Sequence, residues 1–183
     1  MATDMNDMER DYNRRLEKDF KEKLKGKAVR LSYDELKKRI TQFLETHVIC
    51  TLATCSQDMP RSTIVRYRAR GLTVYILTEG GGKIKNIRNN TNVSGSVCGE
   101  YSGFQSVTGL QFWGKAAIIA PHDGSRYEQV RKLLDVGSRT DLQQAGVTDI
   151  PDMYIIQIEI HRARFLSFPE GILNQVLQVE RKE

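Results

Sequence analysis

The stretch of sequence that decides the fold is Met59–Val97, which reads MPRSTIVRYRARGLTVYILTEGGGKIKNIRNNTNVSGSV. Two runs rich in β-branched and aromatic residues flank an Arg-Gly turn, and three consecutive glycines and a lysine follow the second run. This order predicts strands over 62–67, 72–78 and 93–97, with a glycine loop over 79–82 and a short helix over 83–89 between the last two. The central feature is therefore a hairpin that opens into a glycine-rich loop at the start of a helix.

The rest of the chain adds strands without alternating them regularly with helices. Further strands are predicted over 47–54, 110–120, 153–160 and 163–168, and helices over 32–47 and 126–136. The first helix has Ser32 as its N-cap and Glu35 three residues later, which is the capping-box pattern. A total of about six strands favours an α+β, mostly β protein built on a small antiparallel barrel, rather than a doubly wound sheet. We expect one domain over 31–171, a charged helical arm over 1–30 and a C-terminal tail over 172–183.

Composition excludes several classes of protein. The 183 residues include 28 Lys plus Arg and 23 Asp plus Glu, for a net charge of +5. No apolar stretch approaches the ~20 residues that span a bilayer, and the charged N-terminus does not resemble a signal peptide, so we expect a cytoplasmic protein with no membrane partner. Residues 1–46 hold 12 basic and 10 acidic side chains, a balance that argues against a nucleic-acid partner. The cysteines and histidines lack the close spacing of zinc ligands, so no metal site is predicted.

Positive charge gathers around the glycine loop. Gly80, Gly81 and Gly82 expose backbone N–H groups at a helix start, and Lys83 adds a full charge, which together suit a phosphate. This is not a Walker A loop, because Ile84 follows the lysine where Ser or Thr would bind magnesium. The alternative, a glycine-rich hairpin loop with a solvated lysine, stays open on this feature alone. The neighbouring strand favours the phosphate, because alternate side chains place cations and hydroxyls beside the loop if the two strands pair.

The order and spacing of these elements resemble the pyridoxamine 5'-phosphate oxidase-like flavoproteins. The matching residues are Pro60, Thr63, Ile64, Val65, Thr78, Lys83, Asn86, Ile87, Asn90, Val93, Gly114, Lys115 and Ala116, with Tyr154–Ile160 and Ala163–Phe165 near the end. The resemblance covers roughly Tyr33–Gly171. It implies a six-stranded antiparallel split β-barrel and a homodimer with FMN at the subunit interface.

The same resemblance implies a set of cofactor-binding residues. They are Arg61, Ser62, Thr63, Ile64, Val65, Arg66 and Arg68 on the first strand of the hairpin and just beyond it, Ile76, Leu77 and Thr78 at the end of the second, Gly82, Lys83 and Lys85 at the loop and helix, and Gln111 on a later strand. Authentic pyridoxamine 5'-phosphate oxidases carry a C-terminal Trp and an Arg-x-His-Asp-Arg-like run. The tail QVLQVERKE has neither, which argues against oxidation of vitamin B6 compounds.

The main functional prediction is an FMN-dependent oxidoreductase that exchanges a hydride or electrons with a small molecule, with NAD(P)H as a possible donor. No side chain stands out as a general acid or base, so no catalytic residue is assigned. The alternative is a non-catalytic FMN- or haem-binding module that serves as a sensor, carrier or store. Haem would need an axial ligand from His47, His122, His161 or a cysteine, and His161 is the preferred candidate of these.

Overall fold

The computed structural model describes residues 11, 15, 28–134, 144–146 and 151–179. The predicted arm over 1–30 lies outside the described residues except for residues 11, 15 and 28–30, and so do residues 180–183 of the predicted tail. No helix in the described part of the chain is long and apolar enough to cross a membrane.

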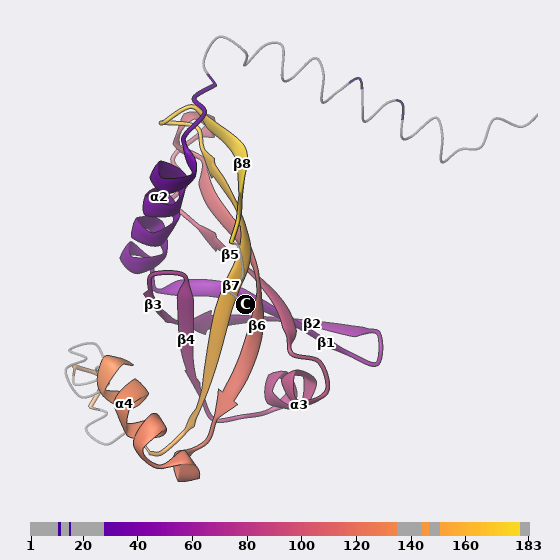
Figure 1. The fold of residues 1–183 in the computed structure, drawn as a ribbon, viewed down its shortest axis with the longest axis vertical. Helices are drawn as coiled ribbons and strands as arrows, with labels where there is room; N and C mark the ends of the chain where they lie inside the picture. Colours follow the sequence, from indigo (N-terminus) through magenta and orange to yellow (C-terminus); the bar gives the residue numbers. More distant parts are fainter. Residues whose placement is uncertain (1–10, 12–14, 16–27, 135–143, 147–150, 180–183) are drawn as a thin grey trace, which may run out of the picture.

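The protein is built on one strongly curled, 8-stranded antiparallel sheet (Figure 1). Its strands follow the order β2-β1-β5-β6-β7-β4-β3, and β8 pairs with β7 beside this path. The strands are β1 (Ile49–Ser56), β2 (Met59–Arg66), β3 (Arg68–Arg70), β4 (Thr73–Thr78), β5 (Asn92–Cys98), β6 (Thr108–Ile119), β7 (Tyr154–Ser167) and β8 (Ile172–Gln178). This confirms the predicted mostly β, antiparallel split barrel.

The number of strands differs from the predicted six. The two late strands predicted over 153–160 and 163–168 form a single strand, β7, because a bulge at His161 lets β7 continue along β6 with a shifted register. Residues 172–178, predicted as tail, form β8, so the sheet continues beyond the predicted domain end at 171. Pro60, which precedes the predicted strand over 62–67, lies within β2, and β2 tolerates it because it is an edge strand.

The structure confirms the helices predicted over 32–47, 83–89 and 126–136 as far as their residues are described. Helix α2 (Tyr33–Thr46) has Ser32 as its N-cap with the full capping box to Glu35. Helix α3 (Gly82–Asn89) follows the glycine loop, and α4 (Ser125–Leu134) follows β6. Two short 3-10 turns, η1 (Phe104–Ser106) and η2 (Pro121–Asp123), flank β6. Figure 1 shows α2 and α4 on one side of the curled sheet and α3 beside the β1–β2 hairpin.

Two apolar clusters hold these elements together. The larger fills the barrel and includes Leu36 and Ile40 of α2, Ile84 and Ile87 of α3, and Phe112 of β6. The smaller lies under α4, where Tyr127 and Leu134 pack with Ile119 and Ile155. Helix α4 therefore covers a separate patch of sheet near β4 and the start of β7.

Candidate functional site

The seam between β2 and β4 is the feature that organises the site. Strand β2 pairs with β1, and β3 pairs with β4, yet β2 and β3 are consecutive in the chain and meet at Tyr67. Tyr67 is buried, its backbone N–H donates to the Val48 carbonyl at 2.8 Å, and its hydroxyl donates to the Leu44 carbonyl at 3.0 Å. The barrel thus closes at Tyr67, and away from it β2 and β4 separate without a described ladder between them. The result is a seam that is closed at Tyr67 and open toward Arg61.

The open end of the seam holds a cationic cradle, which we define as Arg61, Gly82 and Lys83. The Arg61 guanidinium lies so close to Gly82 that a Cβ there would be 2.9 Å from Nη1 and 3.1 Å from Cζ. Lys83 Nζ donates to the Gly80 carbonyl at 3.2 Å. Gly80 and Gly81 have φ of 126° and 81°, conformations that favour glycine. Two cations therefore flank the first turn of α3, where backbone N–H groups also favour an anion.

The electrostatics of the cradle show that its cations crowd one another. Burial lowers the pKa of Lys83, the nearby Arg61 lowers it further, and Glu79 partly opposes both effects. An anion bound between the two cations would relieve this repulsion. Lys85 is exposed farther along α3.

Two asparagines that were not predicted as site residues fix α3 relative to the sheet. Asn86 Nδ2 donates to Thr54 Oγ1 at 3.1 Å, and Asn89 Nδ2 donates to Ser56 Oγ at 3.1 Å. Both bonds join α3 to β1, the strand that pairs with β2, and so hold Gly82 against Arg61. The sequence signal was two asparagines three apart on a short helix, but their partners on β1 could not be read from it.

Toward the closed end, three of the predicted residues line a cavity of about 100 Å³. They are Arg66, Arg68 and Leu77. Leu77 precedes Thr78, whose Oγ1 accepts a hydrogen bond from Gly80 N at 3.3 Å, and alternation along β4 sends these two side chains to opposite faces of the sheet. Arg61 and Arg66 are five residues apart on one strand, which separates the two ends by roughly 17 Å. Thr63 and Val65 lie half-buried between them.

Other predicted residues face elsewhere. Ile76 is fully buried in the barrel core, because its side chain alternates with those of Tyr75 and Leu77 along β4. A ligand in the seam could reach it only through its backbone. Ser62 and Ile64 point to the other side of β2, away from Thr63 and Val65.

Ile64 belongs to what we call the outer face, the surface of the sheet away from the barrel core. One row of this face crosses six strands in register: Ile64, Thr51, Ser96, Gln111, Arg164 and Val176. Gln111 is therefore three strand spacings from β2, roughly 14 Å, and β6 is two strand spacings from β4 on the other side. Three apolar side chains of the outer face are exposed: Ile49 at 51%, Ile64 at 76% and Val176 at 43%.

The histidines considered as haem ligands differ in their contacts and in their burial. His47 Nδ1 lies 2.8 Å from the Phe43 carbonyl, and its ring stacks on Phe43 with centroids 4.0 Å apart. The preferred candidate, His161, sits in the bulge of β7 with its Nδ1 atom buried. The His122 side chain is 85% exposed in η2. No cluster of three or more His, Cys, Asp or Glu side chains that could hold a metal occurs in the described residues.

Comparison with known proteins gives matches over most of the chain. A family model described as pyridoxamine 5'-phosphate oxidase matches residues 36–167. Among solved structures, the general stress protein 26 from Bacillus anthracis is 20% identical, with a TM-score of 0.54, and the match covers 79% of this chain and 98% of that one. No curated protein matches.

Two further solved structures are of proteins whose descriptions mention different cofactors. A FAD-binding protein from Mesorhizobium loti is 18% identical, with a TM-score of 0.50, and the match covers 69% of this chain and 90% of that one. HutZ, the haem storage protein from Vibrio cholerae, is 17% identical, with a TM-score of 0.52 and coverage of 67% and 88%. At these identities the likeness concerns the fold.

Proposed function

This chain belongs to the pyridoxamine 5'-phosphate oxidase family, and from that premise we propose that it binds FMN in the seam between β2 and β4 as a flavin-dependent oxidoreductase. The observation that carries the proposal is the contact of the Arg61 guanidinium with Gly82, next to Lys83. The cradle offers a phosphate a fork of N–H donors, an ammonium group and the first turn of a helix. These are complementary to the terminal phosphate of FMN.

The shape of the seam also fits this cofactor. FMN carries its phosphate and its ring at opposite ends of a ribityl chain, and the seam offers a cationic cradle at one end and half-buried strand at the other. Thr63 and Val65 of β2 and Thr78 of β4 would line the ring, and the exposed backbone of the separated strands would offer it hydrogen bonds. The flavin, when bound, supplies hydride or electron transfer. This chain's residues would bind it and orient it between β2 and β4.

We extend the proposal to a homodimer. The outer face leaves Ile49, Ile64 and Val176 exposed, and a second copy would cover them. Gln111 lies on the outer face, three strand spacings from β2 and two from β4, and we expect it to meet a flavin bound at the partner's seam. The dimer would therefore complete the site as well as bury apolar surface.

The proposal is tested by adding FMN to flavin-free protein and following the quenching of flavin fluorescence. We expect saturable binding at one FMN per chain, weakened at least about tenfold by Lys83→Met. A matched control is Lys85→Met, which removes an exposed lysine farther along the same helix and is expected to weaken binding much less. A lack of binding, even when FMN is present in excess over the protein, would contradict the proposal.

A second measurement separates an enzyme from a binder, and flavin from haem. Anaerobic addition of NAD(P)H to the FMN-loaded protein should bleach the long-wavelength flavin band if this donor is used. Bound FMN that no nicotinamide or other donor reduces would favour the non-catalytic binding module. If the protein does not bind FMN and shows a Soret band when haem is added, the haem-binding alternative is favoured instead.

A further inference from the structure

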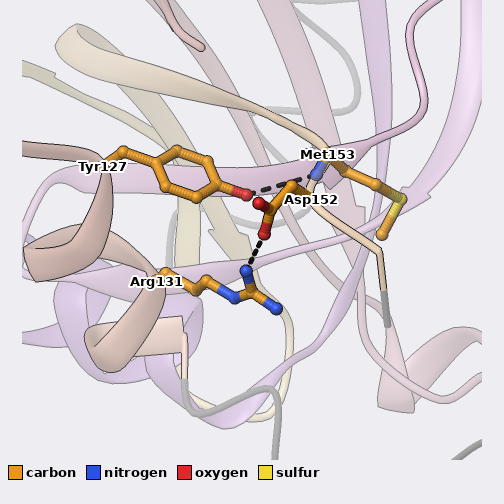
Figure 2. Close-up of polar contacts among 4 residues, drawn as sticks. All are labelled: Tyr127, Arg131, Asp152 and Met153. Carbon is orange, nitrogen blue, oxygen red and sulfur yellow. Dashed lines mark hydrogen bonds and ion pairs between the residues drawn. The ribbon is translucent and has the colours of Figure 1, made fainter. Parts of the chain in front are cut away.

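Arg164 of β7 is a cation on the outer face that has no acceptor among the described residues. Its side chain is half-buried, yet it forms no hydrogen bond, ion pair or ring contact with any residue that the structure describes. Arg131, which is also half-buried, pairs with Asp152 (Figure 2). In the same figure, Met153 N donates to the Tyr127 hydroxyl at 3.2 Å, and this bond ties the segment that holds Asp152 to α4. A half-buried guanidinium with five N–H donors and no such partner suits an anion that comes from elsewhere.

The neighbours of Arg164 on the outer face offer it no carboxylate. Its own row contains no acidic residue, and neither does the next row, which runs Ser62, Ala53, Ser94, Trp113, Arg162 and Gln178. The one acid of β7, Glu159, lies five residues away, roughly 17 Å along the strand, and stands opposite Lys115 in the ladder with β6. An anion paired with Arg164 therefore comes from outside the described part of the chain.

A second copy of this chain is the partner that the outer face favours. Ile64 and Val176, at the two ends of the row that contains Arg164, are 76% and 43% exposed, and a second copy would bury them. Gln111 stands opposite Arg164 in the ladder between β6 and β7, and it is the residue that we expect to meet a flavin in the partner's seam. Residues opposite each other in a ladder lie about 5 Å apart, so a ligand that touches one is within reach of the other.

The seam of its own chain is far from Arg164 when measured along the sheet. Four strand spacings, roughly 19 Å, separate it from β2. On the other side, β4 begins at the residue that pairs with Glu159, so Arg164 lies roughly 17 Å beyond the start of β4. The seam of another copy is therefore the better candidate for a contact with this side chain.

The partner's seam holds an anion when FMN is bound. The cradle of Arg61, Gly82 and Lys83 provides for the phosphate, and the ring lies away from it. Addition of two electrons and one proton to the neutral ring leaves one negative charge on it, and a guanidinium beside the ring stabilises that charge. The exposed Glu79, next to the cradle, is the other acceptor that the seam of a second copy offers.

We propose that Arg164 of one copy contacts the flavin in the seam of the other and stabilises the negative charge of the reduced ring. The proposal rests on the proposed function, because it requires both FMN and a homodimer. Each site of the dimer then combines the cradle of one copy with Arg164 of the other.

The first test measures the midpoint potential of bound FMN by equilibrium reduction against a reference dye. Arg164→Gln should weaken the binding of reduced FMN about tenfold relative to oxidised FMN, which lowers the two-electron potential by about 30 mV. Arg164→Lys keeps the charge and should recover most of this loss. The matched control is Arg162→Gln, which removes the same charge from the same strand and face, where the guanidinium lies 4.9 Å from the Trp113 ring centroid. This control should change the ratio of the two affinities less than about twofold.

The second test asks whether Arg164 acts across the interface. Heterodimers of an Arg164→Gln subunit and a Lys83→Met subunit are isolated through two different affinity tags. The Lys83→Met cradle binds FMN weakly, so the flavin occupies the seam of the Arg164→Gln subunit and faces the intact Arg164 of the other. We expect this flavin to have the wild-type potential. If it keeps the lowered potential of the Arg164→Gln homodimer, Arg164 acts within its own chain and the proposal is wrong.

Other results would also overturn the proposal, and they separate it from the proposed function. If FMN does not bind, both are wrong. If FMN binds but the protein stays monomeric, or the potential does not respond to Arg164→Gln, or Arg162→Gln has an equal effect, this inference alone is wrong. A dimer that Arg164→Gln weakens even without FMN, with an unchanged potential in the loaded protein, would identify Glu79 as the acceptor instead of the flavin.

Discussion

Replacing Gly82 with alanine should weaken FMN binding without destabilising the protein. Gly82 begins α3 and is absent from the positions of positive φ, so alanine fits its backbone. Alanine is favoured over glycine by up to about 1 kcal/mol inside a helix, and by less in the first turn. The fold should therefore be unchanged or slightly more stable. Any loss of cofactor affinity then reports on the cradle rather than on unfolding.

The size of the effect follows from the contact with Arg61. The new Cβ would lie 2.9 Å from Nη1, whereas ordinary contact begins at 3.4 Å, so the guanidinium must retreat by 3.4 − 2.9 = 0.5 Å. Arg61 can move at little cost, since its guanidinium is the far end of a flexible side chain. A charged hydrogen bond to phosphate that lengthens by this amount loses much of its strength, about 1–2 kcal/mol. The dissociation constant of FMN should rise by roughly 5–30-fold.

The assay is a fluorescence titration with FMN, paired with thermal unfolding of the flavin-free protein. The control is a double-mutant cycle with Arg61→Gln, which removes the group that the new methyl displaces. In the Arg61→Gln background the penalty of Gly82→Ala should disappear. If Gly82→Ala raised the dissociation constant of FMN equally in both backgrounds, displacement of Arg61 could not be the cause. An unchanged dissociation constant in the wild-type background would refute the placement of the phosphate.

Three further predictions concern titration, packing and reactivity. Burial and a neighbouring arginine lower the pKa of Lys83, so this lysine loses its proton at a lower pH than an ordinary lysine of pKa 10.5. FMN affinity should therefore fall as the pH rises, and the fall should begin at a lower pH than it would with an ordinary lysine. Lys83→Met should abolish this pH dependence in the FMN titration. Gly95→Ala would place a Cβ 2.2 Å from Cζ of the buried Phe112 and should cost about 1–3 kcal/mol in chemical denaturation, whereas Gly109→Ala, with a nearest atom at 3.6 Å, should change stability by less than about 0.5 kcal/mol. Burial raises the pKa of Cys50 to about 12, so mass spectrometry should find it unmodified by iodoacetamide in the native protein and modified after unfolding.

The parts of the fold that sequence could predict are those set by local chemistry. Ser32 and Glu35 are three residues apart, and the capping box that they form determines where α2 begins. The structure contains this capping box. The glycine loop and the start of α3 follow from backbone freedom and the helix signal. Strand β8 was missed because its sequence, ILNQVLQ, buries Ile172 and Leu177 but carries polar residues between them. Its assignment depends on pairing with β7, which is tertiary information.

The residues of the candidate site could be proposed from the sequence, but their arrangement could not. The contact between Arg61 and Gly82 joins two elements that no spacing rule connects. Three consecutive residues of β4, Ile76–Thr78, were predicted together, although alternation along a strand sends Ile76 into the core. Gln111 was predicted with the others, but the strand order separates it from β2. The sequence indicates which types of side chain are available, whereas their direction and distance depend on the sheet.

The closure of the barrel at Tyr67 argues for a flavin over haem. Burial, reinforced by nearby Cys50, raises the pKa of Tyr67, so its hydroxyl keeps its proton and its bond to the Leu44 carbonyl. With β2 and β3 tied at that point, the seam is closed at Tyr67 and has the cationic cradle toward its other end. We expect such an arrangement to favour a ligand that carries its negative charge at one tip, as FMN does. Haem needs an axial side chain, but His47 Nδ1 lies 2.8 Å from the Phe43 carbonyl and His161 Nδ1 is buried in the bulge of β7.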